Sequence, residues 1–260
     1  MKIIKIPFSI GEHSGAETAP DKILSLTNEL FFSESGCLPL FEQDKVQVSK
    51  VFEETKNNIY CKAKEVLKST IKPLFLGGDH SISVPIVKAF SECYPENPGI
   101  IIFDAHPDAK NDFMPEGQED LLCALVNQKI IKKENIILVG TRNWDKKEIE
   151  FIQQNKIKCY PMKEIILEGI HETSESIMSV AKNFKVLYLS IDIDVLDPAF
   201  APGTGYLEPG GLSTRELLFF IHRIKRMYNL KAMDLVEINP EKDINDMTSK
   251  VGAKILVEFC

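Results

Sequence analysis

Short apolar runs, most of which do not alternate with polar residues, constrain the fold of this chain more than any other feature. The runs lie at residues 3–6, 74–76, 100–103, 136–139, 186–191 and 232–236. This pattern is expected of parallel strands that helices cover on both faces. Stretches with helical periodicity lie between them, at residues 51–68, 82–90, 120–128, 146–154, 174–182, 214–227 and 243–258. Ser213 and Glu216 have the spacing of a capping box at the start of one such stretch. The alternation predicts an α/β fold with three layers, α/β/α, around a doubly wound, mainly parallel sheet.

Length and composition limit the class of protein. The chain has 260 residues, of which 44% are hydrophobic and 27% charged, so we expect one domain over residues 1–260 with an ordinary core. A formal net charge of −7 disfavours nucleic acid as a partner and is compatible with a cationic substrate. No apolar stretch approaches the roughly 18 residues of a membrane span, so we expect no membrane partner. The six cysteines form no C-x-x-C pair, which is typical of reduced thiols in a cytoplasmic protein.

Acidic and histidine residues follow one of the apolar runs at a spacing of two. The run 100–103 leads directly into Asp104, His106 and Asp108. If the chain stays extended there, the three side chains lie on one face. Two carboxylates and an imidazole brought together would repel one another or be buried without partners, and a metal ion removes both costs.

Two further runs end in residues of the same kind. The run 186–191 ends in Asp192 and Asp194, and the run 74–76 ends in Gly77-Gly-Asp-His-Ser81, whose glycines permit a sharp turn beside His80. Each motif alone also fits a solvated turn, a helix cap or an anion-binding turn. Together they favour a metal centre, because ligands of doubly wound folds bind beyond the carboxyl ends of the strands.

The types of these side chains indicate which metal is bound. Four carboxylates and two imidazoles form an oxygen-rich set without a thiolate, which favours Mn²⁺, with Fe²⁺, Co²⁺, Ni²⁺ or Zn²⁺ as alternatives. Six ligands exceed what one open catalytic ion needs. They suit two ions about 3.5–4 Å apart that share a bridging water or hydroxide.

The motifs resemble those of the ureohydrolase family, which includes arginase, agmatinase and formiminoglutamase. The resemblance rests on Gly77-Gly-Asp-His-Ser81, Asp104-Ala-His-Pro-Asp108 and Ser190-Ile-Asp-Ile-Asp-Val-Leu-Asp-Pro198, and it runs from about residue 3 to the end of the chain. Glu208-Pro-Gly-Gly-Leu212 is also similar to the family. Asp234-Leu-Val-Glu-Ile-Asn-Pro240 matches the segment that carries the family's guanidinium-binding carboxylate.

The resemblance implies an arginase-like fold and a role for each matching residue. It implies that Asp104 and Asp192 bridge two manganese ions and that Asp108 also orients the bridging hydroxide. Glu237 is then expected to bind the cationic guanidinium or amidinium group of the substrate. The implied reaction is hydrolysis of a C–N bond in a small guanidino compound, with release of urea. A homo-oligomer, trimer or hexamer, is implied by the resemblance alone. The complete implied set of metal ligands is His80, Asp104, His106, Asp108, Asp192 and Asp194.

The chain departs from the family in the loop after Asp108. Arginases and agmatinases usually have a histidine there that is thought to carry a proton to the leaving amine, but residues 109–124 contain none. His13 follows the first predicted strand on the side of the expected site, so it is a candidate catalytic residue. Glu116 and Glu119 are alternative proton carriers. His171 and His222 lie in or beside predicted helices and are expected to be surface or core residues.

Two other departures concern the substrate. Tyr206 stands where the family commonly continues with Thr-Pro after Thr-Gly, and it is a candidate for lining the pocket. Lys110 stands where arginases have an asparagine, and it is a candidate partner for a substrate carboxylate; a solvated loop lysine is the alternative. Two other functions therefore stay open: a formimino- or guanidino-acid hydrolase, and a metal-binding relative that does not catalyse and acts as a regulatory partner.

Overall fold

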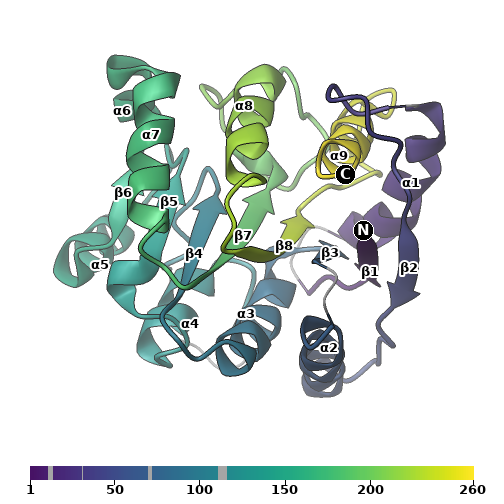
Figure 1. The fold of residues 1–260 in the computed structure, drawn as a ribbon, viewed down its shortest axis with the longest axis horizontal. Helices are drawn as coiled ribbons and strands as arrows, with labels where there is room; N and C mark the ends of the chain where they lie inside the picture. The colour runs from purple at the N-terminus through teal and green to yellow at the C-terminus, as the bar shows by residue number, and fades with distance from the viewer. Residues whose placement is uncertain (11–13, 31, 70–71, 111–115) are drawn as a thin grey trace.

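An eight-stranded sheet forms the centre of the computed structural model, which describes residues 1–10, 14–30, 32–69, 72–110 and 116–260 (Figure 1). All seven pairs of neighbouring strands are parallel, so the predicted α/β fold is confirmed. The strand order is β2-β1-β3-β8-β7-β4-β5-β6. The bounds are β1 Lys2–Ile6, β2 Glu42–Lys45, β3 Pro73–Gly77, β4 Pro98–Phe103, β5 Ile136–Val139, β6 Lys158–Tyr160, β7 Val186–Asp192 and β8 Leu230–Val236.

Helices cover both faces of the sheet (Figure 1). One face packs against α1 (Ala19–Leu26), α6 (Met162–Glu168), α7 (Ile170–Ala181), α8 (Thr214–Ile224) and α9 (Met247–Glu258). The other packs against α2 (Phe52–Leu67), α3 (Ser83–Cys93), α4 (Leu121–Asn127) and α5 (Lys146–Asn155). Short 3-10 turns lie at η1 Ala16–Thr18, η2 Thr27–Glu29, η3 His80–Ile82, η4 Lys133–Asn135 and η5 Ile193–Val195.

The two faces of the sheet explain why the apolar runs do not alternate. Side chains of one strand point alternately to the two faces, so Ile101 and Phe103 of β4 enter one hydrophobic cluster while Ile100 and Ile102 enter the other. All four are at most 2% exposed. Every position of β4 is therefore buried, and its sequence carries no polar side chain.

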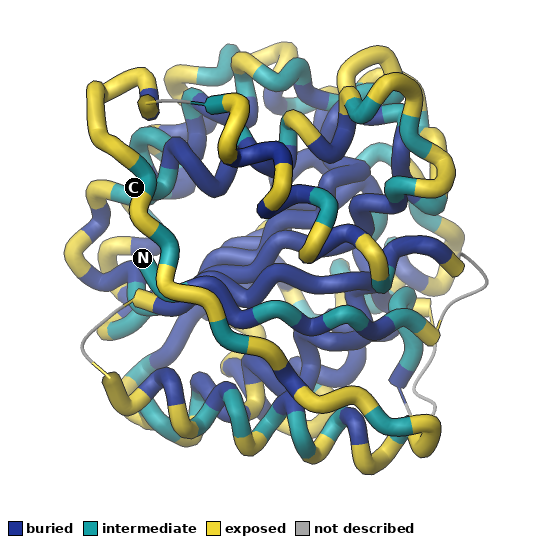
Figure 2. The backbone as a smooth tube through the Cα atoms, turned by 90° about the vertical axis from the view of Figure 1, so that its right-hand side faces the viewer, coloured by how far each residue is buried: buried dark blue, intermediate teal, exposed yellow. Residues whose placement is uncertain are grey.

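The prediction missed the two edge strands. In β2, Glu-Gln-Asp-Lys carries no apolar residue, and it forms a strand because it pairs in parallel with β1. Lys2 lies opposite Glu42 in the register, and its ammonium is 3.2 Å from the Glu42 carboxylate. Figure 2 shows the buried central strands behind this more exposed edge of the sheet. Edge strands bury little surface, so hydrophobic patterning gives little sign of them.

Side chains that cap helices set several of the helix boundaries. The capping box of Ser213 and Glu216 at the start of α8 is confirmed. The helix α9 begins later than predicted because the Asp243 carboxylate accepts hydrogen bonds from the amides of Thr248 and Ser249, at 2.9 and 2.8 Å. The helices α1 and α6 were not predicted. Within the described residues, no helix is both long and apolar enough to span a membrane.

The topology brings distant segments to one edge of the sheet. Since all eight strands are parallel, their carboxyl ends lie on the same side, and β3, β8, β7 and β4 are consecutive in the sheet. The segments that follow these four strands begin at residues 78, 237, 193 and 104. These segments hold the acidic and histidine motifs found in the sequence.

Candidate metal centre

The six predicted metal ligands come together beyond the ends of three central strands. His80 lies in η3, just after β3, and Asp192 and Asp194 lie at the end of β7 and in η5. Asp104, His106 and Asp108 follow β4. Five of the six are buried, and the His106 side chain is 20% exposed and faces the pocket described below.

One group of ligand atoms surrounds the Nδ1 atom of His80. This nitrogen lies 3.2 Å from Asp104 Oδ2, 3.0 Å from Asp108 Oδ2 and 3.3 Å from Asp192 Oδ2. Burial and the neighbouring charge of Asp104 raise the pKa of Asp108 to about 7. Burial, with the charges of nearby carboxylates, also raises the pKa of Asp192 well above its usual range. The protein therefore pays an electrostatic cost to hold these carboxylates together.

A second group surrounds the Nδ1 atom of His106. This nitrogen lies 2.9 Å from Asp194 Oδ2 and 3.7 Å from Asp104 Oδ1. Asp104 thus presents one oxygen to each histidine. Two sets of side chains have the arrangement of a metal site, His80 with Asp104 and Asp108, and Asp104 with His106 and Asp194; within each set the ligand atoms lie within 4.8 Å of one another.

Unpaired buried atoms support the fit of a metal ion to these residues. Within the described part of the chain, His80 Nδ1, Asp104 Oδ2 and Asp108 Oδ2 are buried and have no hydrogen-bond partner. A buried polar atom without a partner costs about 1–3 kcal/mol, and more if it is charged. Both carboxylate oxygens lie close to the same ring nitrogen, so a cation placed among them would satisfy all three atoms.

The backbone is strained at two of the predicted functional residues. Asp108 and Glu237 have φ angles of 54° and 64°, in the left-handed region that residues other than glycine rarely adopt. The turns are held by hydrogen bonds from the Leu122 amide to the Asp108 carbonyl (2.9 Å) and from the Glu237 amide to the Gly78 carbonyl (2.8 Å). Both side chains line the pocket over the centre. Such strain is often found where a side chain must be aimed for function.

Glu237 follows β8, between the loops that carry the candidate ligands. Its Oε1 atom accepts a hydrogen bond of 2.7 Å from the amide of His80. Burial, and then the charge of Asp79, raise the pKa of Glu237 well above its usual range, although the His80 amide opposes this. A buried carboxylate of this kind would gain stability from a cationic partner.

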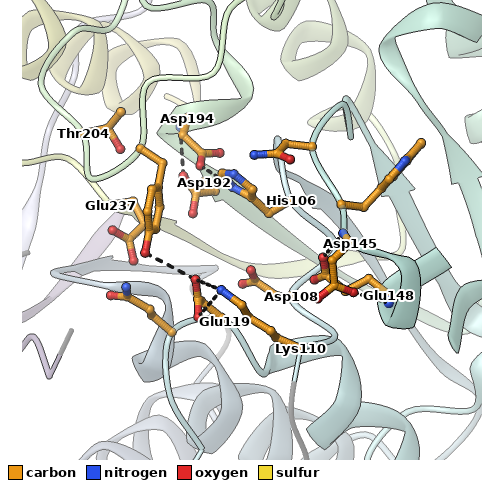
Figure 3. Close-up of a pocket in the computed structure, with 14 residues that line it drawn as sticks. His106, Asp108, Lys110, Glu119, Asp145, Glu148, Asp192, Asp194, Thr204 and Glu237 are labelled. Atoms are coloured by element: carbon orange, nitrogen blue, oxygen red, sulfur yellow. Dashed lines mark hydrogen bonds and ion pairs between the residues drawn. The ribbon is translucent and has the colours of Figure 1, made fainter. Parts of the chain in front are cut away.

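A cavity of about 190 Å³ opens over the centre (Figure 3). Besides the candidate ligands, acidic side chains line it, namely Glu119, Asp145, Glu148 and Glu237. Among the described residues that line the cavity, Lys110 is the one lysine or arginine. Thr204 Oγ1 and Gln118 Oε1 also line it, and neither atom has a hydrogen-bond partner in the described chain. The cavity is therefore small, acidic and provided with polar atoms that a ligand can satisfy.

Lys110 and Tyr206 meet at this cavity through Glu119. The Lys110 ammonium donates to both carboxylate oxygens of Glu119, at 2.9 and 3.0 Å, and the Tyr206 hydroxyl donates to one of them at 3.3 Å (Figure 3). The Tyr206 ring also packs edge-on against the His106 ring, with centroids 5.5 Å apart. Both predicted substrate-binding residues thus line the cavity, but Lys110 is already paired with an acid.

The structure separates the other candidates for proton transfer. Glu116 is buried, and its carboxylate pairs with Lys56 of α2 and with Gln128, so it does not line the cavity. His222 bonds to the buried Glu258 at 2.7 Å, and the ring centroid of His171 lies 6.2 Å from that of Phe219; neither histidine lines the cavity. His13 lies outside the described residues.

Arg142 is an important residue that the sequence analysis missed. Its guanidinium donates to the backbone carbonyls of Asp194 (2.7 Å), Leu196 (3.1 Å) and Glu208 (2.6 Å). Its own amide donates to the Ala105 carbonyl at 2.9 Å. Arg142 thus joins the loops after β4, β5 and β7, which surround the centre. Its position shortly after the run 136–139, at the same edge of the sheet, was the available signal.

Comparisons with known proteins agree with this architecture. The sequence model of the Arginase family matches residues 1–260. The chain is 39% identical to an arginase of Staphylococcus aureus (strain COL) over 204 residues, which cover 72% of this chain and 67% of that protein. It is 33% identical to an agmatinase of Bacillus subtilis (strain 168) over 232 residues, covering 89% and 75%. Among solved structures, formimidoylglutamase from Bacillus subtilis superposes with a TM-score of 0.92 at 27% identity, covering 99% of this chain and 85% of that one.

The substitution Arg142→Lys tests whether this residue holds the loops together. A lysine ammonium cannot donate hydrogen bonds to all of the carbonyls that the guanidinium contacts. We therefore expect the free energy of unfolding to fall by roughly 2–3 kcal/mol. The measurement is urea denaturation in the presence of a chelator, which excludes any contribution from bound metal. Arg215→Lys, at a side chain that is 72% exposed, is the matched control and should change stability by less than about 0.5 kcal/mol. Equal effects of the two substitutions would contradict the role given to Arg142.

Proposed function

The chain belongs to the arginase family, and from that premise we propose that it is a binuclear manganese hydrolase that releases urea from a small guanidino compound. As a member of this family it is a metal-dependent amidinohydrolase. The observation that carries the finer proposal is the meeting of two histidines around the shared carboxylate of Asp104. We further propose that residues 1–260 act as one catalytic domain.

We propose that Asp104 would help to hold both ions, because its two oxygens face different histidines. His80 and Asp108 would hold one ion with it, and His106 and Asp194 would hold the other. Asp192, which the family resemblance implies as a second shared ligand, would also contribute to the centre; its Oδ2 lies 3.3 Å from His80 Nδ1. When bound, the ions supply Lewis acidity and make water a nucleophile near neutral pH.

The remaining pocket residues bind and orient the substrate. Glu237 is the proposed partner of the guanidinium group, because it is buried, lines the cavity and has one oxygen fixed by the His80 amide. Thr204 Oγ1 and Gln118 Oε1 are unpaired atoms in the same wall and can hydrogen-bond the planar group. Asp108, aimed by its strained turn, orients the attacking water.

The leaving amine must also gain a proton. Of the two glutamates considered from the sequence, Glu119 lines the cavity and Glu116 does not, so we propose Glu119 as the carrier. His13 stays a prediction from the sequence.

The charge of the cavity favours one class of substrate. A formimino or guanidino acid would place its carboxylate beside Lys110, but Glu119 already occupies that ammonium, and Asp145 and Glu148 add negative charge to the same cavity. A substrate that carries a positive charge at the end away from its guanidinium group would instead be attracted by these carboxylates. We therefore propose a guanidino amine of the agmatine type rather than a guanidino acid. The full set of candidate ligands, together with Glu237, disfavours a non-catalytic role.

The proposal is tested by measuring urea release from Mn²⁺-loaded protein. The substrates are agmatine, arginine, guanidinobutyrate, guanidinopropionate and formiminoglutamate. We expect the wild type to release urea from agmatine. In Asp108→Ala, kcat should fall by about a hundredfold or more, which is the size of effect expected when a transition-state contact is lost. Asp21→Ala, at an exposed residue of α1, is the control and should keep full activity. Release of formamide or ammonia without urea would indicate a formimino hydrolase. If metal-loaded protein released no product from any of the substrates, the non-catalytic alternative would be favoured.

The substitution Lys110→Met tests the charge of the substrate's far end. Agmatine and guanidinobutyrate carry opposite charges there, so their kcat/KM values can be compared directly. We expect the wild type to prefer agmatine and Lys110→Met to raise kcat/KM for agmatine about threefold to tenfold, because Glu119 loses its internal partner. Lys146→Met, at a side chain that is 89% exposed, should change neither value. A wild type that prefers guanidinobutyrate and loses that activity in Lys110→Met would contradict the proposal.

A further inference from the structure

A buried chain of hydroxyl groups lies behind His80, on the ring nitrogen that does not face the carboxylates. His80 Nε2 is 3.1 Å from Ser190 Oγ, and the Ser190 hydroxyl donates to Asp234 Oδ1 at 2.7 Å. Ser190 of β7 and Asp234 of β8 are register partners in the sheet. All three residues are at most 1% exposed, so water does not compete for these bonds.

The second oxygen of Asp234 is also occupied. Oδ2 accepts hydrogen bonds from the Tyr188 hydroxyl at 2.9 Å and from the Ser83 hydroxyl at 2.7 Å. Burial raises the pKa of Asp234, while His80 and the three hydroxyl bonds oppose that rise. Burial and the adjacent Asp234 raise the pKa of Tyr188 well above its usual range, so Tyr188 keeps its proton and acts as a donor. Three hydroxyl protons thus point at one carboxylate, which accepts all of them.

These contacts fix the direction in which the hydrogen bonds between His80, Ser190 and Asp234 are donated. A serine hydroxyl has one proton, and Ser190 uses it on Asp234. Towards His80, Ser190 can then only accept. The proton of the neutral imidazole must therefore be on Nε2, which leaves the lone pair on Nδ1.

We propose that Asp234 is a positioning residue that holds His80 in the tautomer able to bind metal through Nδ1. This inference rests on the proposed metal centre. It is supported by a separate observation, that Nδ1 is the buried atom of His80 without a hydrogen-bond partner in the described chain, close to three carboxylate oxygens. In the opposite tautomer, an N–H group would point at the place of the ion. Asp234 would therefore act through the direction of these hydrogen bonds, and not through packing alone.

Two substitutions separate polarity from packing. Asp234→Asn keeps the shape of the side chain, and its one oxygen is needed by the hydroxyls of Ser83 and Tyr188. Its NH₂ group then faces Ser190 and donates to it, so Ser190 turns its own proton towards His80 and drives the ring proton to Nδ1. Ser190→Ala removes the hydrogen bonds of the Ser190 hydroxyl to His80 and to Asp234, but it does not reverse their direction. Ser83→Ala is the control, because it leaves the bonds from Ser190 and Tyr188 in place.

The test is a calorimetric titration in which Zn²⁺ is added to chelator-stripped protein. We expect Asp234→Asn to weaken the affinity of one zinc site about 10–100-fold, the size of effect seen when an outer hydrogen-bond partner of a metal ligand is lost. Ser190→Ala should weaken it less, and Ser83→Ala by less than about threefold. Wild-type affinity in Asp234→Asn, or a larger loss in Ser190→Ala, would overturn the inference. No substrate is used, so a failure to release urea does not affect the result.

A second measurement is made on the wild type, and a variant serves only to assign the signals. In the zinc-loaded wild type labelled with ¹⁵N-histidine, the His80 ring should carry its proton on Nε2 and bind zinc through Nδ1, and His80→Gln identifies its signals by their loss. A proton on Nδ1, or zinc on Nε2, would overturn the inference. A wild type that binds no zinc would instead overturn the proposed centre itself.

Discussion

The crowding of carboxylates at one edge of the sheet is the constraint on which the rest of the structure depends. Asp104 and Asp108 offer oxygens within 4.8 Å of each other. Two unit charges at that distance repel by roughly 3 kcal/mol even at an effective dielectric constant of about 20. A domain is stable by only about 5–15 kcal/mol in total, so several such pairs cannot persist uncompensated. Burial and the charge of Asp104 accordingly raise the pKa of Asp108 to about 7, and bound cations would offset the repulsion.

The fold supports this crowding with residues that fix the ligands from behind. The parallel strands β3, β8, β7 and β4 deliver the ligand segments to one place. Arg142 then ties the loops together through their carbonyls, and the hydroxyls around Asp234 lock the ring of His80. Strain at Asp108 and Glu237 aims the two side chains into the cavity. A ligand set of this kind needs such support, because small displacements of ligands weaken metal binding.

The sequence predicted the buried parts of this arrangement well and the relations between distant segments poorly. The central strands were predicted because most of their positions are apolar. The six candidate ligands were singled out because acidic and histidine residues follow three of these runs, in two cases at a spacing of two. The edge strand Glu42–Lys45 had no such signal. Arg142 and Asp234 act through carbonyls and hydroxyls of other strands, and those partners depend on a strand order that one sequence does not reveal. For the same reason, the pairing of Lys110 with Glu119 could not be foreseen.

The number of metal ions per chain tests the central claim most directly. Chelator-stripped protein should be titrated with Mn²⁺ and the bound metal counted by elemental analysis after gel filtration. We expect two ions per chain in the wild type, about one in Asp194→Asn, and none retained in Asp104→Asn, because Asp104 belongs to both groups of candidate ligands. One ion per chain in the wild type, or an Asp104→Asn variant that keeps both ions, would contradict it.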